Sequence, residues 1–135
     1  MNLLLDTHIA LWAISDSPKL PDKARELITD PDNTIYFSSV SSWEVLMKRD
    51  ATHTNLKLTV TEFVEYCEEA GYYQLNMSNK HIISASGLDT KDAEEHGHRD
   101  PFDRLLLAQA KSEKMGFITH DELIPFYNEG CVVKV

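Results

Sequence analysis

Four acidic residues that lie far apart in the chain are the groups most able to do chemistry: Asp6, Glu44, Asp103 and Asp121. Each falls where an expected strand meets the following helix, or inside that helix. A parallel sheet gathers the carboxyl ends of its strands along one edge, where ligands bind. Carboxylates that converge there repel one another unless divalent cations neutralise them. The sequence therefore predicts a site for one or two Mg²⁺ or Mn²⁺ ions, with phosphodiester hydrolysis as its chemistry.

The elements that must position these acids alternate between strand and helix patterns, which predicts an α/β fold with a mainly parallel sheet. Strands are expected over 2–5, 35–37, 72–75, 117–119 and 131–135. Helices are expected over 7–15, 21–28, 41–49, 59–70, 78–86 and 100–114. The polar stretch 87–98 is expected to be a loop. The chain contains no repeat or linker, so residues 1–135 are expected to form a single domain.

Three of the acids also have a purely structural explanation. Asp6 precedes a helix, where aspartate is a favourable N-cap. Ser41 and Glu44 match a capping box, in which the glutamate serves the start of its own helix. Asp121 ends a strand, where aspartate is common in turns. Helix capping by itself, however, does not account for four acids at four joints of one sheet edge.

The segment around Asp100 offers two candidate ligands one turn apart. Asp100 precedes Pro101, a favourable first helical residue, so Asp100 is expected to cap the helix. Asp103 is therefore the preferred metal ligand and Asp100 the second choice, although either could instead interact with the helix dipole. Thr7 and Thr119 are expected to orient waters or carboxylates around the site.

Basic residues near two of the acids are candidate RNA contacts: Lys48, Arg49, Arg99 and Arg104. Lys48 lies one turn beyond Glu44, so a simple helix salt bridge is its structural alternative. The six histidines do not form a helical zinc pair, and most are expected to be solvated surface residues. Substrate specificity is expected to lie in residues 87–98 and 48–57.

The charge of the chain limits its partners. Thirteen basic and 22 acidic side chains give a net charge of −9, whereas nucleic-acid-binding proteins usually carry a basic footprint. Two bound divalent ions would reduce −9 to −5, and the remainder favours a small RNA footprint, a basic protein partner, or both. The first residues lack a basic leader and a long apolar region, so a cytoplasmic location without membrane attachment is expected. Cys67 and Cys131 have no metal-site or redox spacing and are expected to be reduced.

The chain resembles the PIN-domain family, and specifically the VapC-type toxins of bacterial toxin–antitoxin pairs. The markers that carry the resemblance are Leu4–His8, Ser39–Glu44, His98–Ala110 and Ile118–Asp121, of which His98–Ala110 is the most specific. The resemblance covers essentially the whole chain. It implies a three-layer α/β/α sandwich around a mainly parallel five-stranded sheet.

The resemblance also implies a function. It implies an endoribonuclease that depends on Mg²⁺ or Mn²⁺ and is built on Asp6, Glu44, Asp103 and Asp121. It further implies a homodimer and a small cognate antitoxin, which the acidic balance fits if a basic segment enters the acidic groove. One departure from many relatives is that Lys48–His53 replaces a glycine-centred turn after the helix that carries Glu44.

Three other functions fit the sequence less well. A phosphoacceptor receiver domain needs an adjacent acidic pair after its first strand, but Asp6 is followed by Thr7. A phosphatase with an Asp-x-Asp nucleophile fails because position 8 is histidine. A catalytically silent PIN-like scaffold that binds RNA or a protein remains the main alternative, and failure to bind Mn²⁺ would favour it.

Overall fold

The computed structural model describes residues 1–50 and 56–135, and these residues form a five-stranded sheet in which every neighbouring pair is parallel. The strand order is β3-β2-β1-β4-β5. The strands are β1 (Asn2–Leu5), β2 (Thr34–Ser38), β3 (Tyr73–Leu75), β4 (Gly116–Thr119) and β5 (Val132–Lys134). The helices are α1 (Thr7–Ile14), α2 (Asp22–Thr29), α3 (Ser39–Asp50), α4 (Val60–Glu69), α5 (Asn79–Ser86), α6 (Lys91–Glu95) and α7 (Pro101–Glu113), with a 3₁₀ turn η1 (Ile124–Tyr127).

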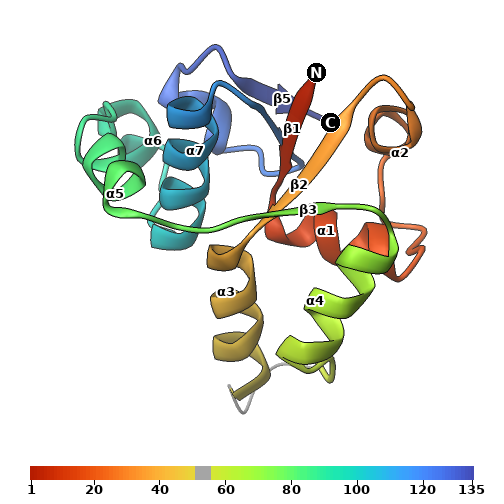
Figure 1. The fold of residues 1–135 in the computed structure, drawn as a ribbon. Coiled ribbons are helices and arrows are strands. Elements are labelled where there is room, and N and C mark those ends of the chain that lie inside the picture. The colour runs from red at the N-terminus through yellow and green to blue at the C-terminus, as the bar shows by residue number, and fades with distance from the viewer. Residues whose placement is uncertain (51–55) are drawn as a thin grey trace.

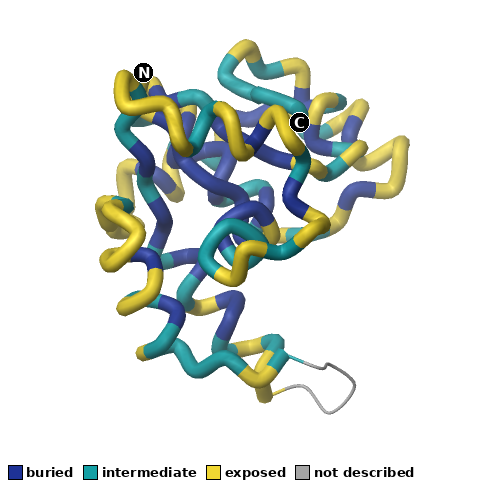
Figure 2. The backbone as a smooth tube through the Cα atoms, turned by 90° about the vertical axis from the view of Figure 1, so that its right-hand side faces the viewer, coloured by how far each residue is buried: buried dark blue, intermediate teal, exposed yellow. Residues whose placement is uncertain are grey.

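Helices cover both faces of the sheet, so the predicted α/β/α sandwich is confirmed (Figure 1). Side chains alternate between the faces of a strand, and β1 shows this directly. Leu3 and Leu5 join a core with residues of α1, α2 and α4, whereas Leu4 joins a second core with residues of α7. Because both faces are covered, the centre of the sheet is buried (Figure 2), and Leu3, Leu4 and Leu5 of β1 are apolar and completely inaccessible to solvent. No helix in the described ranges is long and apolar enough to cross a lipid bilayer.

Most predicted elements and the predicted cap at Asp100 are confirmed. Thr59 and Glu62 form a capping box at the start of α4, with both reciprocal hydrogen bonds at 3.1 Å. Asp100 caps α7, because its Oδ1 accepts from the backbone N–H of Phe102 at 2.8 Å and of Asp103 at 3.3 Å. Residues 51–55, which include part of the segment expected to set specificity, lie outside the described residues.

The prediction of a capping box at Ser41 and Glu44 is wrong. Helix α3 follows β2 without a connecting loop and begins at Ser39, and the Ser38 hydroxyl accepts from the Val40 N–H at 2.9 Å. Ser41 therefore lies within the first turn, where its hydroxyl hydrogen-bonds that of Thr7 at 2.8 Å. Glu44 has no capping role in this arrangement, because it lies in the second turn.

The expected loop over 87–98 is also partly wrong, because it contains α6. Ala93 in this helix is buried in the second core, together with Leu88 and Tyr127 of η1. One buried alanine in a charged segment gives no helical periodicity, so the pattern did not reveal the helix. Helix α7 ends at Glu113, and the following residue, Lys114, caps it in a left-handed conformation with φ of 57°.

A buried hydrogen bond joins α7 to the junction of β2 and α3. The Ser38 hydroxyl donates to Oε1 of Gln109, and both side chains are completely buried. The Gln109 amide nitrogen lies 3.4 Å from Nδ1 of His81, which is also buried. This chain of polar groups links the helix that carries Asp103 to the helix that carries Glu44.

We expect Gln109→Leu to lower the free energy of unfolding by about 1–3 kcal/mol, because the volume is retained but the Ser38 hydroxyl loses its buried acceptor. Gln74→Leu is the matched control, since the Gln74 side chain is exposed and bonds only Glu68 on the surface; its effect should stay within about 0.5 kcal/mol. Urea denaturation measures both variants. Equal effects of the two substitutions would contradict a structural role for the Ser38–Gln109 bond.

Candidate active site

The four predicted acids come together at the carboxyl edge of the sheet, where the strand order changes direction. The chain runs outward from β1 through β2 to β3 and then returns to place β4 on the other side of β1. Ligands bind at such a switch point in open α/β sheets. Asp6 follows β1, Glu44 lies on α3, Asp103 lies on α7 and Asp121 follows β4. Asp6, Glu44 and Asp121 all raise the pKa of Asp103, and Glu44 and Asp121 also raise the pKa of Asp6, because their charges lie close together.

Asp6 is held by three neighbours. Its backbone N–H donates to the Ile118 carbonyl at 2.9 Å, which extends the β1–β4 pairing to the site. Its Oδ1 accepts from the Thr7 backbone N–H at 2.7 Å, and its Oδ2 accepts from the Thr119 hydroxyl at 2.6 Å. Asp6 is thus the N-cap residue of α1, as its structural explanation predicts, and its carboxylate is also fixed toward the other acids. Thr119 orients Asp6 through its side chain and Thr7 does so through its backbone.

Glu44 is the most unusual of the acids because its side chain is only 1% exposed. Its Oε2 forms a salt bridge with Lys48 at 2.5 Å. Its Oε1 is buried and has no hydrogen-bond partner within residues 1–50 and 56–135. A buried carboxylate oxygen without a partner is costly, so this atom requires a cation or water that completes its surroundings.

Asp103 lies beside a histidine that sequence reasoning placed on the surface. His98 is buried, with its Nε2 3.3 Å from Asp103 Oδ2 and its Nδ1 2.8 Å from the Tyr127 hydroxyl. A ring nitrogen of His98 and one carboxylate oxygen each of Asp103 and Asp121 lie within 4.8 Å of one another. His98 belongs to the same sequence marker as Asp103, but the charged residues before it hid its burial.

His81 is a second buried histidine among the described residues. It lies on the buried side of α5, where its Nδ1 accepts from the Ser78 N–H at 3.1 Å and its Nε2 lies 2.8 Å from Glu113. His8, His96 and His120 are exposed, as expected. Burial of His81 and His98 depends on packing against α7 and η1, which a pattern of single histidines does not encode.

Asp121 and Asp100 have part of their carboxylates engaged by the backbone. Asp121 Oδ1 accepts from the Leu123 N–H at 2.7 Å, as its structural explanation as a turn residue predicts. Its own N–H donates to the Thr119 hydroxyl at 3.1 Å, so Thr119 joins Asp121 to Asp6. Asp100 uses Oδ1 for its cap, and this role favours Asp103 over Asp100 as the ligand.

Burial and mutual repulsion make the acids weaker acids than usual. Burial is the main cause that raises the pKa of Asp103 to about 9, and repulsion from Asp6 adds to it. Burial also raises the pKa of Asp6 to about 6, although the hydrogen bonds from Thr119 and Thr7 oppose the shift. Perturbed carboxyl groups of this kind gather at functional sites.

The basic residues proposed as RNA contacts lie in different surroundings. Lys48 pairs with Glu44, as its structural alternative predicts, and Arg49 is exposed on α3. Arg104 is half-buried and donates to the Ala85 carbonyl at 2.9 Å, so its guanidinium is directed to α5. Arg99 donates to the Glu94 carbonyl at 2.7 Å.

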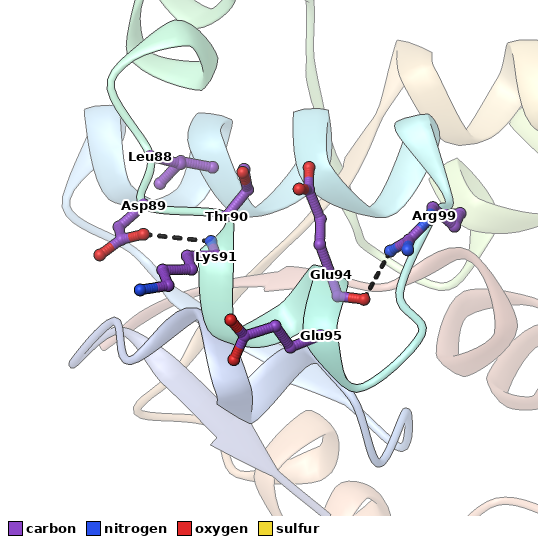
Figure 3. A pocket seen from close by; sticks show the side chains of 7 residues that line it. All are labelled: Leu88, Asp89, Thr90, Lys91, Glu94, Glu95 and Arg99. Carbon is purple, nitrogen blue, oxygen red and sulfur yellow. Dashed lines mark hydrogen bonds between the residues drawn. The ribbon is translucent and has the colours of Figure 1, made fainter.

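Arg99 belongs to a cavity of about 550 Å³ over α6, apart from the four acids (Figure 3). The cavity is lined by Leu88, Asp89, Thr90, Lys91, Glu94, Glu95 and Arg99. Its three acids outnumber its two bases. Asp89 accepts from the backbone N–H of Lys91, and the Arg99 guanidinium donates to the backbone carbonyl of Glu94. None of the four clustered acids lines it, so the wide cavity and the candidate active site are separate features.

Comparisons with known proteins agree with this geometry. A family model described as "PIN domain" matches residues 3–127. The fold is similar to that in the crystal structure of VapBC2 from Rickettsia felis bound to a DNA fragment from their promoter, with 18% identity, a TM-score of 0.66 and coverage of 100% of this chain and 98% of that one.

Two further structures share the fold. DNA-bound VapBC from Salmonella typhimurium has 15% identity and a TM-score of 0.62, covering 96% of this chain and 92% of that chain. FitAcB from Neisseria gonorrhoeae has 18% identity and a TM-score of 0.59, covering 98% and 96%. No curated protein matches the chain by sequence.

The raised pKa values predict how stability depends on pH when no metal is bound. The folded protein keeps protons on Asp6 up to a pKa of about 6 and on Asp103 up to about 9, whereas the unfolded chain releases them near pH 4. The folded state therefore binds more protons in this window, and stability must fall as the pH rises. We expect the Tm in EDTA to decrease from pH 5 to pH 9, and Asp103→Asn to flatten the upper part of this decrease. Asp32→Asn, an exposed acid in the turn before β2, should leave the slope unchanged; an equally flat profile for it would contradict the assignment.

His98 should contribute to metal binding. A group that orients or joins a metal ligand typically accounts for about 10–100-fold in affinity, so His98→Asn should weaken Mn²⁺ binding measured by calorimetry by that order. His96→Asn is the matched control, because His96 is exposed in the same segment and stacks on Phe126. Unchanged Mn²⁺ affinity in His98→Asn would exclude such a role.

Proposed function

The chain belongs to the PIN-domain family, and on this premise we propose that it is a metal-dependent endoribonuclease that acts as the toxin of a toxin–antitoxin pair. The observation that carries the proposal is the cluster of three buried acids, Asp6, Glu44 and Asp103, with the half-buried Asp121 beside them. Among the described residues, Lys48 forms a salt bridge with Glu44 of this cluster. Most of the negative charge of the cluster therefore needs another counter-ion. A structural role gives no reason to bury so many acids together.

The cluster fits a hard divalent cation. Mg²⁺ and Mn²⁺ take oxygen ligands from carboxylates, and the Glu44 Oε1 that lacks a protein partner among the described residues is such an oxygen. Asp6, Glu44, Asp103 and Asp121 would hold one or two ions, with His98 beside Asp103. A bound ion of this kind lowers the pKa of water and stabilises charge on phosphate oxygens.

The residues of the chain then have distinct tasks. Thr119 fixes Asp6 and Asp121 relative to each other, and His98 orients Asp103. The Ser38–Gln109 bond sets the distance between the helices of Glu44 and Asp103. A bound cation would keep these acids ionised as its ligands. No side chain of the cluster would then serve as a general acid, so the leaving 3′ oxygen would take its proton from water.

Partners follow from the same site and from the similar structures. VapBC and FitAcB are the proteins to which this fold is similar, and a net charge of −9 favours a basic partner. We therefore propose a small antitoxin whose basic segment enters the acidic groove and covers Asp6 and Glu44. We further propose that residues 1–135 act as one domain, in a homodimer, in the cytoplasm.

The proposed activity is tested by incubating single-stranded and total cellular RNA with the purified protein and Mg²⁺, Mn²⁺ or EDTA. Discrete fragments should appear with either metal, and Asp6→Asn should lower the rate at least about 100-fold, because it removes a charge on which metal binding depends. Asp32→Asn is the matched control and should cleave normally. Cleavage that survives EDTA or Asp6→Asn would contradict the proposal. Folded, antitoxin-free protein that neither binds Mn²⁺ nor cleaves RNA would instead support the catalytically silent scaffold.

A further inference from the structure

A small pocket of about 200 Å³ opens beside the acid cluster, on the side of α1. Its lining consists of Asp6, His8, Trp12, His120 and Asp121. Two of these residues belong to the acid cluster, and the other three carry aromatic rings. A phosphodiester bound at the acids would therefore place one of its attached nucleosides against aromatic side chains.

The three rings form one contiguous aromatic platform, in which neighbouring rings are tilted rather than coplanar. His8 and Trp12 are one turn apart on α1, with ring centroids 5.8 Å apart at 45°. Trp12 and His120 are also 5.8 Å apart and meet edge to face at 69°. A ring inserted between two others would need a separation of about 7 Å, or two van der Waals contacts. The observed separation is shorter, so a planar ligand must stack on the open side of the rings.

The platform is held in place before any ligand arrives. His120 Nδ1 lies 2.7 Å from the Val135 oxygen, which ties the ring to the end of the chain. Trp12 packs partly against the core formed with α4. Pre-organised groups of this kind reduce the entropic cost of binding.

We propose that His8, Trp12 and His120 form a nucleobase-binding subsite next to the acid cluster, in which one unpaired base of the RNA stacks beside the phosphate to be cleaved. The inference rests on the proposed nuclease function. Stacking of unpaired bases on aromatic rings is a general mode of single-strand recognition, and the stacking contact itself does not depend on a positive charge. It therefore provides affinity that a protein with a net charge of −9 gains poorly from phosphate contacts.

A second aromatic surface supplies the control. Trp43 is 54% exposed and lines an apolar groove of about 330 Å³ with Met77, Phe102 and Leu105. None of the four acids lines this groove. Trp12 and Trp43 are the two tryptophans of the chain, so each can be studied alone after the other is replaced.

Binding is tested by tryptophan fluorescence with ligands that cannot be cleaved. Trp43→Phe leaves Trp12 as the reporter, and Trp12→Phe leaves Trp43. In Mn²⁺, nucleoside 5′-monophosphates should quench Trp12 in a saturable manner, whereas ribose 5-phosphate, which has no base, should not. Trp43 should not respond to either. Equal quenching of Trp12 by ribose 5-phosphate, or no quenching by any nucleotide, would overturn the subsite whether or not the protein cleaves RNA.

Catalysis provides the second test, with Trp12→Leu retaining apolar volume against the core. Its kcat/KM for single-stranded RNA should fall about tenfold, while hydrolysis of an abasic oligoribonucleotide, a diester chain without aromatic groups, should change less than about twofold. Trp43→Leu should affect neither substrate. A larger loss with Trp43→Leu than with Trp12→Leu would overturn the assignment. A wild-type protein that hydrolyses neither substrate but shows nucleotide quenching of Trp12 would refute the nuclease and support the subsite.

Discussion

Mutual repulsion of buried carboxylates is the constraint around which this molecule is arranged. Asp6, Glu44 and Asp103 are all nearly inaccessible to solvent, and the pKa of Asp103 rises to about 9 because of burial and neighbouring charge. Such a cluster weakens the protein unless protons or cations neutralise it. The fold tolerates the cluster because two apolar cores, one on each face of the sheet, stabilise the strands that end there.

The parallel sheet explains how distant residues meet. Asp6 and Asp121 follow two adjacent strands, β1 and β4, and Thr119 hydrogen-bonds both of them. The other two acids lie on helices, and the Ser38–Gln109 bond fixes those helices relative to each other. Polar groups that look like ordinary caps and turn residues thus also determine the geometry of the site. A substitution far from the acids in sequence can therefore change their arrangement.

Acidic and aromatic groups share one edge of the sheet. The acids are suited to cations, whereas His8, Trp12 and His120 offer aromatic surface directly beside them. This division reconciles an acidic protein with a polyanionic substrate, because the cation binds the phosphate and the rings bind the base. The cavity over α6 is instead lined mainly by charged side chains, and it supplies no comparable aromatic surface.

The sequence by itself determined the order of elements, the parallel sheet and the convergence of the four acids, because these depend on local patterns and on the rule that parallel strands end at one edge. Tertiary structure decided what local patterns cannot encode. The junction at Ser38 moved the helix start, so Glu44 is a buried acid with an unpartnered oxygen among the described residues rather than a capping residue. Packing of η1 against α6 buried His98 beside Asp103. Burial depends on neighbours distant in the chain, so only the folded protein shows which polar side chains lose their water.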